Sequence, residues 1–491
     1  MAVIQFPRRK NNGHRHSAHG SRPERMKFMN DSVAHSLTRT GRYVVLVCAF
    51  LGWFCAGFHL AITTIAMQPA ATHLLEKTGQ LDVVRFQALN KLAPKKGAKP
   101  VATSAISEAD QQQLEEWNSR VARWNAWLVC AFLFGAATGG LVFGRIGDKI
   151  GRSKSMALSI LTYSSMAAAA SFAQSPLQLL VLWYLACTGV GGMWPNGVAL
   201  VSEAWSSLSR AAAAGVIGTS ANIGIFLVST IAAYKPVTVS DWRWIFWIGA
   251  APLVLGLFSL FAVPESPRWL ATRKEVADGQ STPASTWEVF HPPLLRITVV
   301  GILLATIPLF GGWGSANWMV PWAGQVGDAM TPPNPLLKAN VSQARSVTGI
   351  VGSLLGGWIG SIVGRRRAYF MASVLCLASA QYTFWFLIPT DASFLYWVGA
   401  LGFFSGIFFG WLPLFLPELF PTRVRSTGAG VSFNFGRILT AITVFASGAL
   451  IHSEFIRGDY ARLGRMTSLI FALGMLAVLF APDTSRKQLE D

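Results

Sequence analysis

Charged residues are scarce in this chain. Only 13% of its 491 residues are Asp, Glu, Lys or Arg, whereas 52% are hydrophobic and the mean hydropathy is +0.42. A soluble globular protein carries about 25% charged residues. The surplus apolar side chains must face something other than water, which excludes an ordinary soluble domain and favours a membrane protein.

Several chemical signatures are also missing. All five cysteines fall in strongly apolar stretches, so we expect no structural disulfide. The chain has no Gly-x4-Gly-Lys-Ser/Thr loop, which excludes ATP drive by this chain. No cluster of His, Cys or carboxylates has metal-ligand or catalytic spacing. We therefore expect no enzyme activity, no cofactor and no metal.

Apolar stretches long enough to cross a membrane recur twelve times. A spanning helix needs about 20 mostly apolar residues. The sequence therefore predicts an all-α integral membrane protein with twelve transmembrane helices, the seventh of which is interrupted by Gly311, Gly312 and Gly314. The predicted spans are 43–67, 124–146, 155–174, 177–201, 211–234, 243–263, 294–320, 343–363, 368–388, 394–416, 428–451 and 465–481.

The formal net charge of +18 is unevenly distributed. Basic residues gather in the N-terminal tail and in loops that lie on one side, around residues 145–154, 268–274 and 365–367, while most alternate loops are short and nearly uncharged. This asymmetry predicts that both termini are cytoplasmic and that the protein lies in the cell (inner or plasma) membrane. The basic excess is then a topology signal, and we expect no nucleic-acid partner.

Five patterns recur in the same order with offsets of 212 to 218 residues, which predicts two homologous six-helix halves. Halves repeated in the same orientation are related by an axis along the membrane normal, with the solute site between them. The matched pairs are Gly144–Arg152 with Gly357–Arg365, Trp194 with Trp411, Glu203–Arg210 with Glu418–Arg425, Gly218–Gly224 with Gly430–Gly436, and Pro264–Arg268 with Pro482–Arg486.

The predicted organisation follows from this repeat. The halves cover 43–263 and 293–481 and are joined by a polar cytoplasmic linker over 264–292. A basic disordered tail (1–42) precedes them and a short cytoplasmic tail (482–491) follows. An exterior loop over 68–123 interrupts the first half. Its residues Leu114, Trp117, Val121 and Trp124 have helical spacing, which predicts an amphipathic helix that caps the outer mouth or aids oligomerisation.

The repeated motifs resemble those of a known family. Gly144-x-x-x-Asp148-Lys-x-Gly151-Arg152 resembles the signature loop of the major facilitator superfamily. Pro264–Leu270 and Pro417–Arg425 resemble motifs of its sugar-porter and organic-acid symporter branches, and Asn434–Arg437 is similar to a stretch of the carboxylate-transporting branch. The resemblance implies two pseudo-symmetric six-helix bundles that transport a small polar solute by alternating access.

The resemblance also implies a gate, since in this family ion pairs at the signature loop close the cytoplasmic side in the outward-facing state. Asp148 can meet basic groups or a helix end of the other half, and Ser361 stands in its place in the second copy. We expect each Glu-x6-Arg unit to pair across its own turn and to join a switching network. The alternative is interfacial charge without a gating role. The predicted gating residues are Gly144, Asp148, Gly151, Arg152, Glu203, Arg210, Glu265, Arg268, Gly364, Arg365, Glu418 and Arg425.

Polar and aromatic residues inside the predicted spans are candidates for solute binding. Arg437 either holds an anionic substrate or pairs with Glu203 or Glu418, and His59 either relays a proton or is a packed histidine with satisfied hydrogen bonds. The predicted substrate-binding residues are His59, Trp194, Asn196, Asn222, Trp313, Asn317, Trp318, Trp411, Asn434 and Arg437.

Carboxylates expected from the resemblance are missing. In the first span Ala56 and His59 stand where organic-acid symporters carry two aspartates, and in the fourth span Met193 stands where they carry a glutamate. A coupling proton is therefore an open question, and the alternatives are an organic-anion carrier using Arg437 and an uncoupled facilitator of neutral solutes. A membrane sensor with a transporter fold is disfavoured by the short C-terminal tail. We expect the partners to be a small solute and the lipid bilayer, and the protein to be a monomer.

Overall fold

The structure is a computed structural model that describes residues 37–92, 107–205, 207–280, 285–332, 334, 336–450, 456 and 459–484. Most of the predicted basic tail over 1–42 lies outside these residues. Within them every regular element is a helix.

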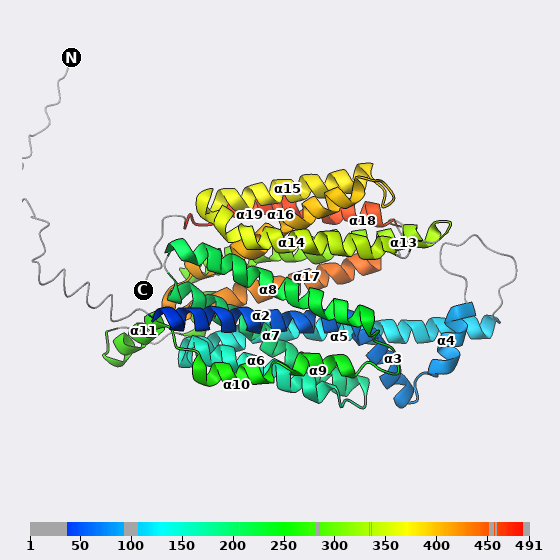
Figure 1. Ribbon diagram of the computed structural model, residues 1–491, viewed down its shortest axis with the longest axis horizontal. Coiled ribbons are helices and arrows are strands. Elements are labelled where there is room, and N and C mark those ends of the chain that lie inside the picture. The colour runs from blue at the N-terminus through cyan, green and yellow to red at the C-terminus, as the bar shows by residue number, and fades with distance from the viewer. Residues whose placement is uncertain are drawn as a thin grey trace, which may run out of the picture. The chain divides into compact units, whose positions relative to one another are not determined.

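The first six predicted spans coincide with helices (Figure 1). Local signals set their starts. The hydroxyl of Thr38 accepts the N–H of Gly41 before the first span, and Ser175 accepts the N–H of Gln178 before the fourth. The helices are α2 (Arg39–Ile65), α5 (Glu108–Ile150), α6 (Arg152–Ala170), α7 (Pro176–Ala204), α8 (Ser207–Tyr234) and the pair α9 (Trp244–Ala250) and α10 (Leu253–Ala262).

The last six spans coincide with helices in the same way. The seventh is irregular where its glycines predict, with a π-helical turn (η2, Gly311–Ser315) and a 3-10 turn (η3, Ala316–Trp318), and it continues past the predicted end. The helices are α12 (Leu294–Phe310) continuing into α13 (Met319–Ala329), α14 (Leu336–Ile362), α15 (Arg365–Phe386), α16 (Phe394–Leu419), α17 (Arg425–Leu450) after the turn η4 (Thr422–Val424), and α18 (Tyr460–Thr467) with α19 (Ile470–Ala477) and η5 (Val478–Phe480).

The prediction of twelve spans is confirmed. Seven helices among the described residues are both long and apolar enough to cross a membrane on length and composition alone. The other spans carry more small or polar residues, as in α6, or are broken, as between α12 and α13. In these spans the neighbouring helices of the bundle, rather than lipid, cover the polar positions.

Small residues allow the helices to approach closely. In the first half Gly139 of α5 lies against the backbone of α7 at Thr188, and in the second half Gly352 of α14 lies against α16 at Phe403. Between the halves, α5 contacts α17 and α8 contacts α14. The interface thus uses two pairs of helices at equivalent places in the repeat.

Further helices connect the spans at both ends of the bundle. α11 (Pro267–Ala277), with the 3-10 turn η1 (Thr286–Phe290), forms the described part of the linker. We call the end of the bundle that carries Gly151, Gly364 and α11 the basic end, and the opposite end the distal end.

At the distal end the predicted amphipathic helix is confirmed, and it is continuous with the second span, so that α5 is 43 residues long (Figure 1). Its residues Leu114, Trp117 and Val121 pack with side chains of α3 (Met67–Lys77) and α4 (Val83–Leu92). We call this group the distal cluster.

Replacing Trp117 by Ala should loosen the distal cluster. Trp117 is 8% exposed and contacts Phe86 edge-on at 6.2 Å, and such truncations cost about 3–5 kcal/mol. We expect trypsin to cleave after Arg85 of α4 at least about tenfold faster. Mass spectrometry of the digest would measure the rate of this cleavage. Val84→Ala is the control, because Val84 is 77% exposed. Unchanged cleavage in the Trp117 variant would contradict this packing.

Candidate functional site

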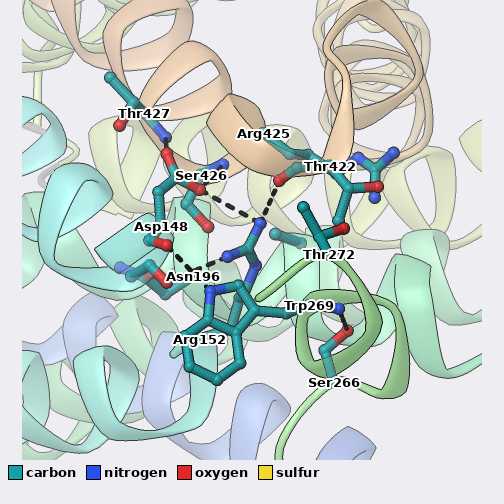
Figure 2. A network of polar contacts seen from close by, with 12 residues as sticks. Asp148, Arg152, Asn196, Ser266, Trp269, Thr272, Thr422, Arg425, Ser426 and Thr427 are labelled. Carbon is teal, nitrogen blue, oxygen red and sulfur yellow. Dashed lines mark hydrogen bonds and ion pairs between the residues drawn. The ribbon is translucent and has the colours of Figure 1, made fainter. Parts of the chain in front are cut away.

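The carboxylate of Asp148, in the last turn of α5, caps the first turn of α17 in the other half. Its oxygens accept the backbone N–H groups of Ser426 at 3.1 Å and Thr427 at 2.8 Å (Figure 2). These N–H groups have no partner within the helix, and the positive end of the helix dipole favours the negative charge. Gly144 lets the helices meet here, since a Cβ atom would lie 2.9 Å from the Ser426 carbonyl oxygen.

Arg152 connects this cap to the rest of the basic end. Its buried guanidinium lies 3.2 Å from Asp148 and 3.5 Å from Glu203, and it donates to the carbonyls of Gly147 and Thr422 (Figure 2). Thr422 belongs to the second half, so one arginine holds both halves together.

Two glycines shape the turns beside these arginines. Gly151 has a φ of 114° and Gly364 a φ of 96°, values that side chains disfavour. The carboxylate of Glu265 then caps α6 by accepting the N–H groups of Arg152 at 2.9 Å and Ser153 at 3.1 Å. The turn is thereby fixed to the linker.

The two Glu-x6-Arg units pair differently from the prediction. Glu203 contacts Arg425 of the other half at 2.7 Å, and Glu418 lies 3.7 Å from Arg210 of the first half. Glu418 also forms a two-pronged pair with Arg365 at 2.8 and 3.0 Å. The expected pairing across each turn is therefore wrong, because each unit's acid meets the arginine of the opposite unit.

The linker covers the same network. Trp269 donates its indole N–H to the backbone carbonyl of Asp148 at 2.9 Å, and Ser266 donates to Glu203 (Figure 2). Arg268 lies in the first turn of α11. All twelve predicted gating residues thus lie at the basic end, and we call the ion pairs and caps among them the latch network.

An exposed pair extends the linker contact. Arg423 of η4 pairs with Glu288 of η1, and this hydrogen bond raises the pKa of Arg423. As a surface pair it contributes only about 0–1 kcal/mol.

A cavity of about 410 Å³ lies between the halves. That volume is within the range of small-molecule sites. Its lining comes from both halves and includes the aromatic residues Trp53, Phe132, Trp194 and Phe433. Among the described residues of its lining none is acidic and two are basic, so this part of the cavity carries uncompensated positive charge.

The first of these basic residues is Arg437 of α17. It is 5% exposed, and its Nη1 atom has no hydrogen-bond partner among the described residues. The guanidinium lies over the rings of Phe433 at 5.1 Å, Phe132 at 5.6 Å and Trp53 at 5.9 Å. Because the acids of the latch network pair with other arginines, the geometry favours the anion-binding alternative over the tether to those acids.

The second basic residue, Arg345 of α14, was not predicted. It lines the same cavity and donates from Nη1 to the carbonyl of Gly312 in the π-helical turn at 3.3 Å. The predicted span began at residue 343, which placed Arg345 at a membrane interface, where arginine is ordinary. The helix begins at Leu336 instead, so Arg345 lies more than two turns inside it.

Among the predicted substrate-binding residues, Trp194 and Asn222 join Arg437 in the lining. Trp194 stacks on Phe433 of the other half at 4.1 Å and 12°. This stacked pair brings α7 and α17 together at the cavity wall.

Two predicted asparagines join helices instead. Asn196 donates to the carbonyls of Phe143 and Gly192, which ties α7 to α5. Asn434 donates to the carbonyl of Gly191, which ties α17 to α7. Neither asparagine belongs to the cavity lining.

His59, Trp411 and Trp318 do not belong to the cavity lining. His59 is buried between the carbonyls of Cys55 and Tyr163, the arrangement of a packed histidine. Trp411 donates to the carbonyl of Arg365, and Trp318 stacks near Tyr460. The side chains of Trp313 and Asn317 lie outside the described part of the structure.

The chain is similar to known transporters. The family model described as Major Facilitator Superfamily matches residues 49–444. A cis,cis-muconate transport protein of Acinetobacter baylyi is 25% identical over 355 residues, covering 72% of this chain and 83% of that protein. A probable 4-methylmuconolactone transporter of Cupriavidus pinatubonensis is 28% identical over 362 residues, covering 71% of this chain and 79% of that protein. The solved proton:xylose symporter XylE of E. coli, bound to 6-bromo-6-deoxy-D-glucose, matches with a TM-score of 0.65 at 16% identity, covering 92% of this chain and 98% of XylE.

Asp148→Asn should open the basic end. The variant loses the charge on the α17 cap and one accepting oxygen, and hydrogen bonds to charged groups contribute about 1.5–3 kcal/mol. We expect the population open at this end to rise by roughly tenfold or more. Lys154 and Arg367 are exposed and lie one in each half. Spin labels at these two positions would report the change as longer label-to-label distances in double electron–electron resonance.

The matched control is Lys149→Gln, which removes an exposed charge one residue from Asp148. It should leave the label distances unchanged. A distance distribution in Asp148→Asn that equals the wild type would show that the α17 cap does not hold this end closed.

Proposed function

The chain belongs to the Major Facilitator Superfamily, and from that membership we propose that it carries organic carboxylates, with Arg437 as the residue that binds their charge. It is a multi-pass membrane transporter of a small solute and not an enzyme. The choice of an anion rests on one observation. Arg437 is almost fully buried, lines the cavity and has an Nη1 atom without a partner.

A buried charge without a counter-charge is costly in the membrane interior. A bound carboxylate would supply both the counter-charge and the missing hydrogen bond to Arg437. The aromatic rings around the guanidinium suit the apolar part of an organic acid. The names of the muconate and muconolactone transporters support the same class of substrate.

A neutral polar solute is the second candidate. Asn222 and Trp194 line the cavity and suit hydroxyl groups, and the XylE structure holds a sugar analogue. A neutral solute would leave the charge of Arg437 uncompensated, so we favour the anion.

For the transport cycle, we propose that the latch network is the gate, closed in this conformation and broken when the halves 43–263 and 293–481 rock apart. The linker over 264–292 would cover it from the cytoplasm. The loops at the basic end carry the positive charge, which supports cytoplasmic termini in the cell membrane. We propose a monomer, since cavity and gate are both complete within one chain.

Coupling cannot use the two usual carboxylate positions. Ala56 and Met193 are buried in α2 and α7 and carry no titratable group. The proposal therefore assigns no proton to either position.

Arg437→Gln should abolish carboxylate uptake. Removing one partner of a buried charge pair costs about 2–5 kcal/mol, so we expect the uptake of cis,cis-muconate or benzoate into proteoliposomes to fall by roughly 100-fold. Xylose serves as the neutral test solute. Arg296→Gln is the control, because Arg296 is an exposed arginine of α12 outside the cavity. Xylose uptake that is equal in wild type and Arg437→Gln, without carboxylate uptake in either, would establish the neutral alternative.

A further inference from the structure

We propose that the cavity binds dicarboxylates, with Arg437 holding one carboxylate and Arg345 the other. The inference rests on the proposed function, since it deepens the substrate class from organic anion to dianion. It is carried by the presence of two arginines, and of no acid, among the described residues of one cavity lining.

Arg345 has a large unused capacity to bind an anion. A guanidinium has five N–H donors in a planar fork that matches a carboxylate. Arg345 is half-buried and donates to one backbone carbonyl, that of Gly312. Among the described residues no carboxylate forms an ion pair with it. A peptide carbonyl satisfies one donor and leaves the charge uncompensated.

The two arginines lie at different depths. Arg345 is 17 residues from the end of α14 at Ile362, and Arg437 is 12 residues from the start of α17 at Arg425, both of these helix ends lying at the basic end. At 1.5 Å per residue these separations are about 26 and 18 Å, which puts Arg345 about 8 Å closer to the distal end for helices along the membrane normal.

The lining beside Arg437 includes aromatic rings. Those of Trp53 and Phe132 lie 5.9 and 5.6 Å from its guanidinium, and Leu309 and Leu412 also belong to the lining. Ser342 and Ser346 lie on the same helix as Arg345. The described lining thus offers two cations at different depths together with apolar surface. A molecule with a carboxylate at each end of an apolar chain is complementary to it.

A monocarboxylate matches this cavity less well. It neutralises one guanidinium and leaves the other as an unpaired charge when the site closes. A dicarboxylate neutralises both. The discrimination follows from the general rule that a site built to bind a polar group rejects the analogue that lacks it.

The experiment compares adipate with hexanoate, which has the same chain length and one carboxylate fewer. Uptake into proteoliposomes is measured at pH 7.5, where carboxyl groups near their usual pKa are ionised. The wild type should take up adipate at least about tenfold more efficiently than hexanoate.

Arg345→Gln should remove this preference. The KM for adipate should rise about tenfold or more while hexanoate uptake changes less than about threefold, and Arg345→Lys, which keeps the charge, should retain the preference in part. Retained hexanoate uptake shows that the variant is folded. Val347→Ala, two residues away on α14, is the matched control and should keep the wild-type preference, because Val347 is exposed and lies outside the cavity lining.

Three results would overturn the proposal. Equal efficiency for adipate and hexanoate in the wild type would show that Arg345 binds no second carboxylate. Equal losses of both acids in Arg345→Gln and in Arg345→Lys would show a structural role. Uptake of neither acid would refute the carboxylate function itself, and the dicarboxylate proposal with it.

Discussion

The closed basic end depends on one carboxylate that satisfies the start of a helix in the other half. Asp148 offers two oxygens to the N–H groups of Ser426 and Thr427, which would otherwise lack partners in a buried position. Around it, Arg152 and Glu203 are held by caps, turns and the linker, so each charge in the group has a counter-charge. Such a group is stable only when complete, because removing one partner leaves a buried charge. It therefore has two useful states, assembled and separated, which is what a gate requires.

The cavity uses the opposite arrangement. In the latch network positive groups meet acids, whereas Arg437 meets aromatic rings and Arg345 meets a peptide carbonyl. Cation–aromatic contacts hold a guanidinium in place without neutralising it. The uncompensated charge is then available to a ligand. The arginines inside this bundle thus form two groups. Those of the latch network pair with acids, whereas the two in the cavity have no acid partner among the described residues.

Sequence alone predicts the helices, their repeat and the location of the gate, because these depend on apolar length, glycine spacing and the side on which basic residues gather. It does not predict partners across the interface. Glu203 is seven residues from Arg210 along the chain, yet its partner is Arg425, because the repeat brings opposite units together. Asn196 and Asn434 look like solute ligands in the sequence but bind carbonyls of neighbouring helices. Arg345 was not predicted as a cavity residue because a sequence does not define the ends of helices precisely.

The cavity and the latch network share two helices, so a solute bound in the cavity would act on the proposed gate. α17 carries Ser426 in its first turn and Arg437 three turns later, and α7 carries Trp194 near the cavity and Glu203 at its end. Trp194 stacked on Phe433 joins the two helices between these levels. A rigid helix moves as a unit, so an anion that repositions Arg437 also changes the position of the Ser426 N–H relative to Asp148. A solute shifts the equilibrium only by its difference in affinity for the two states. Because Ser361 stands where the second copy would have its carboxylate, the proposed coupling runs through the α5–α17 contact.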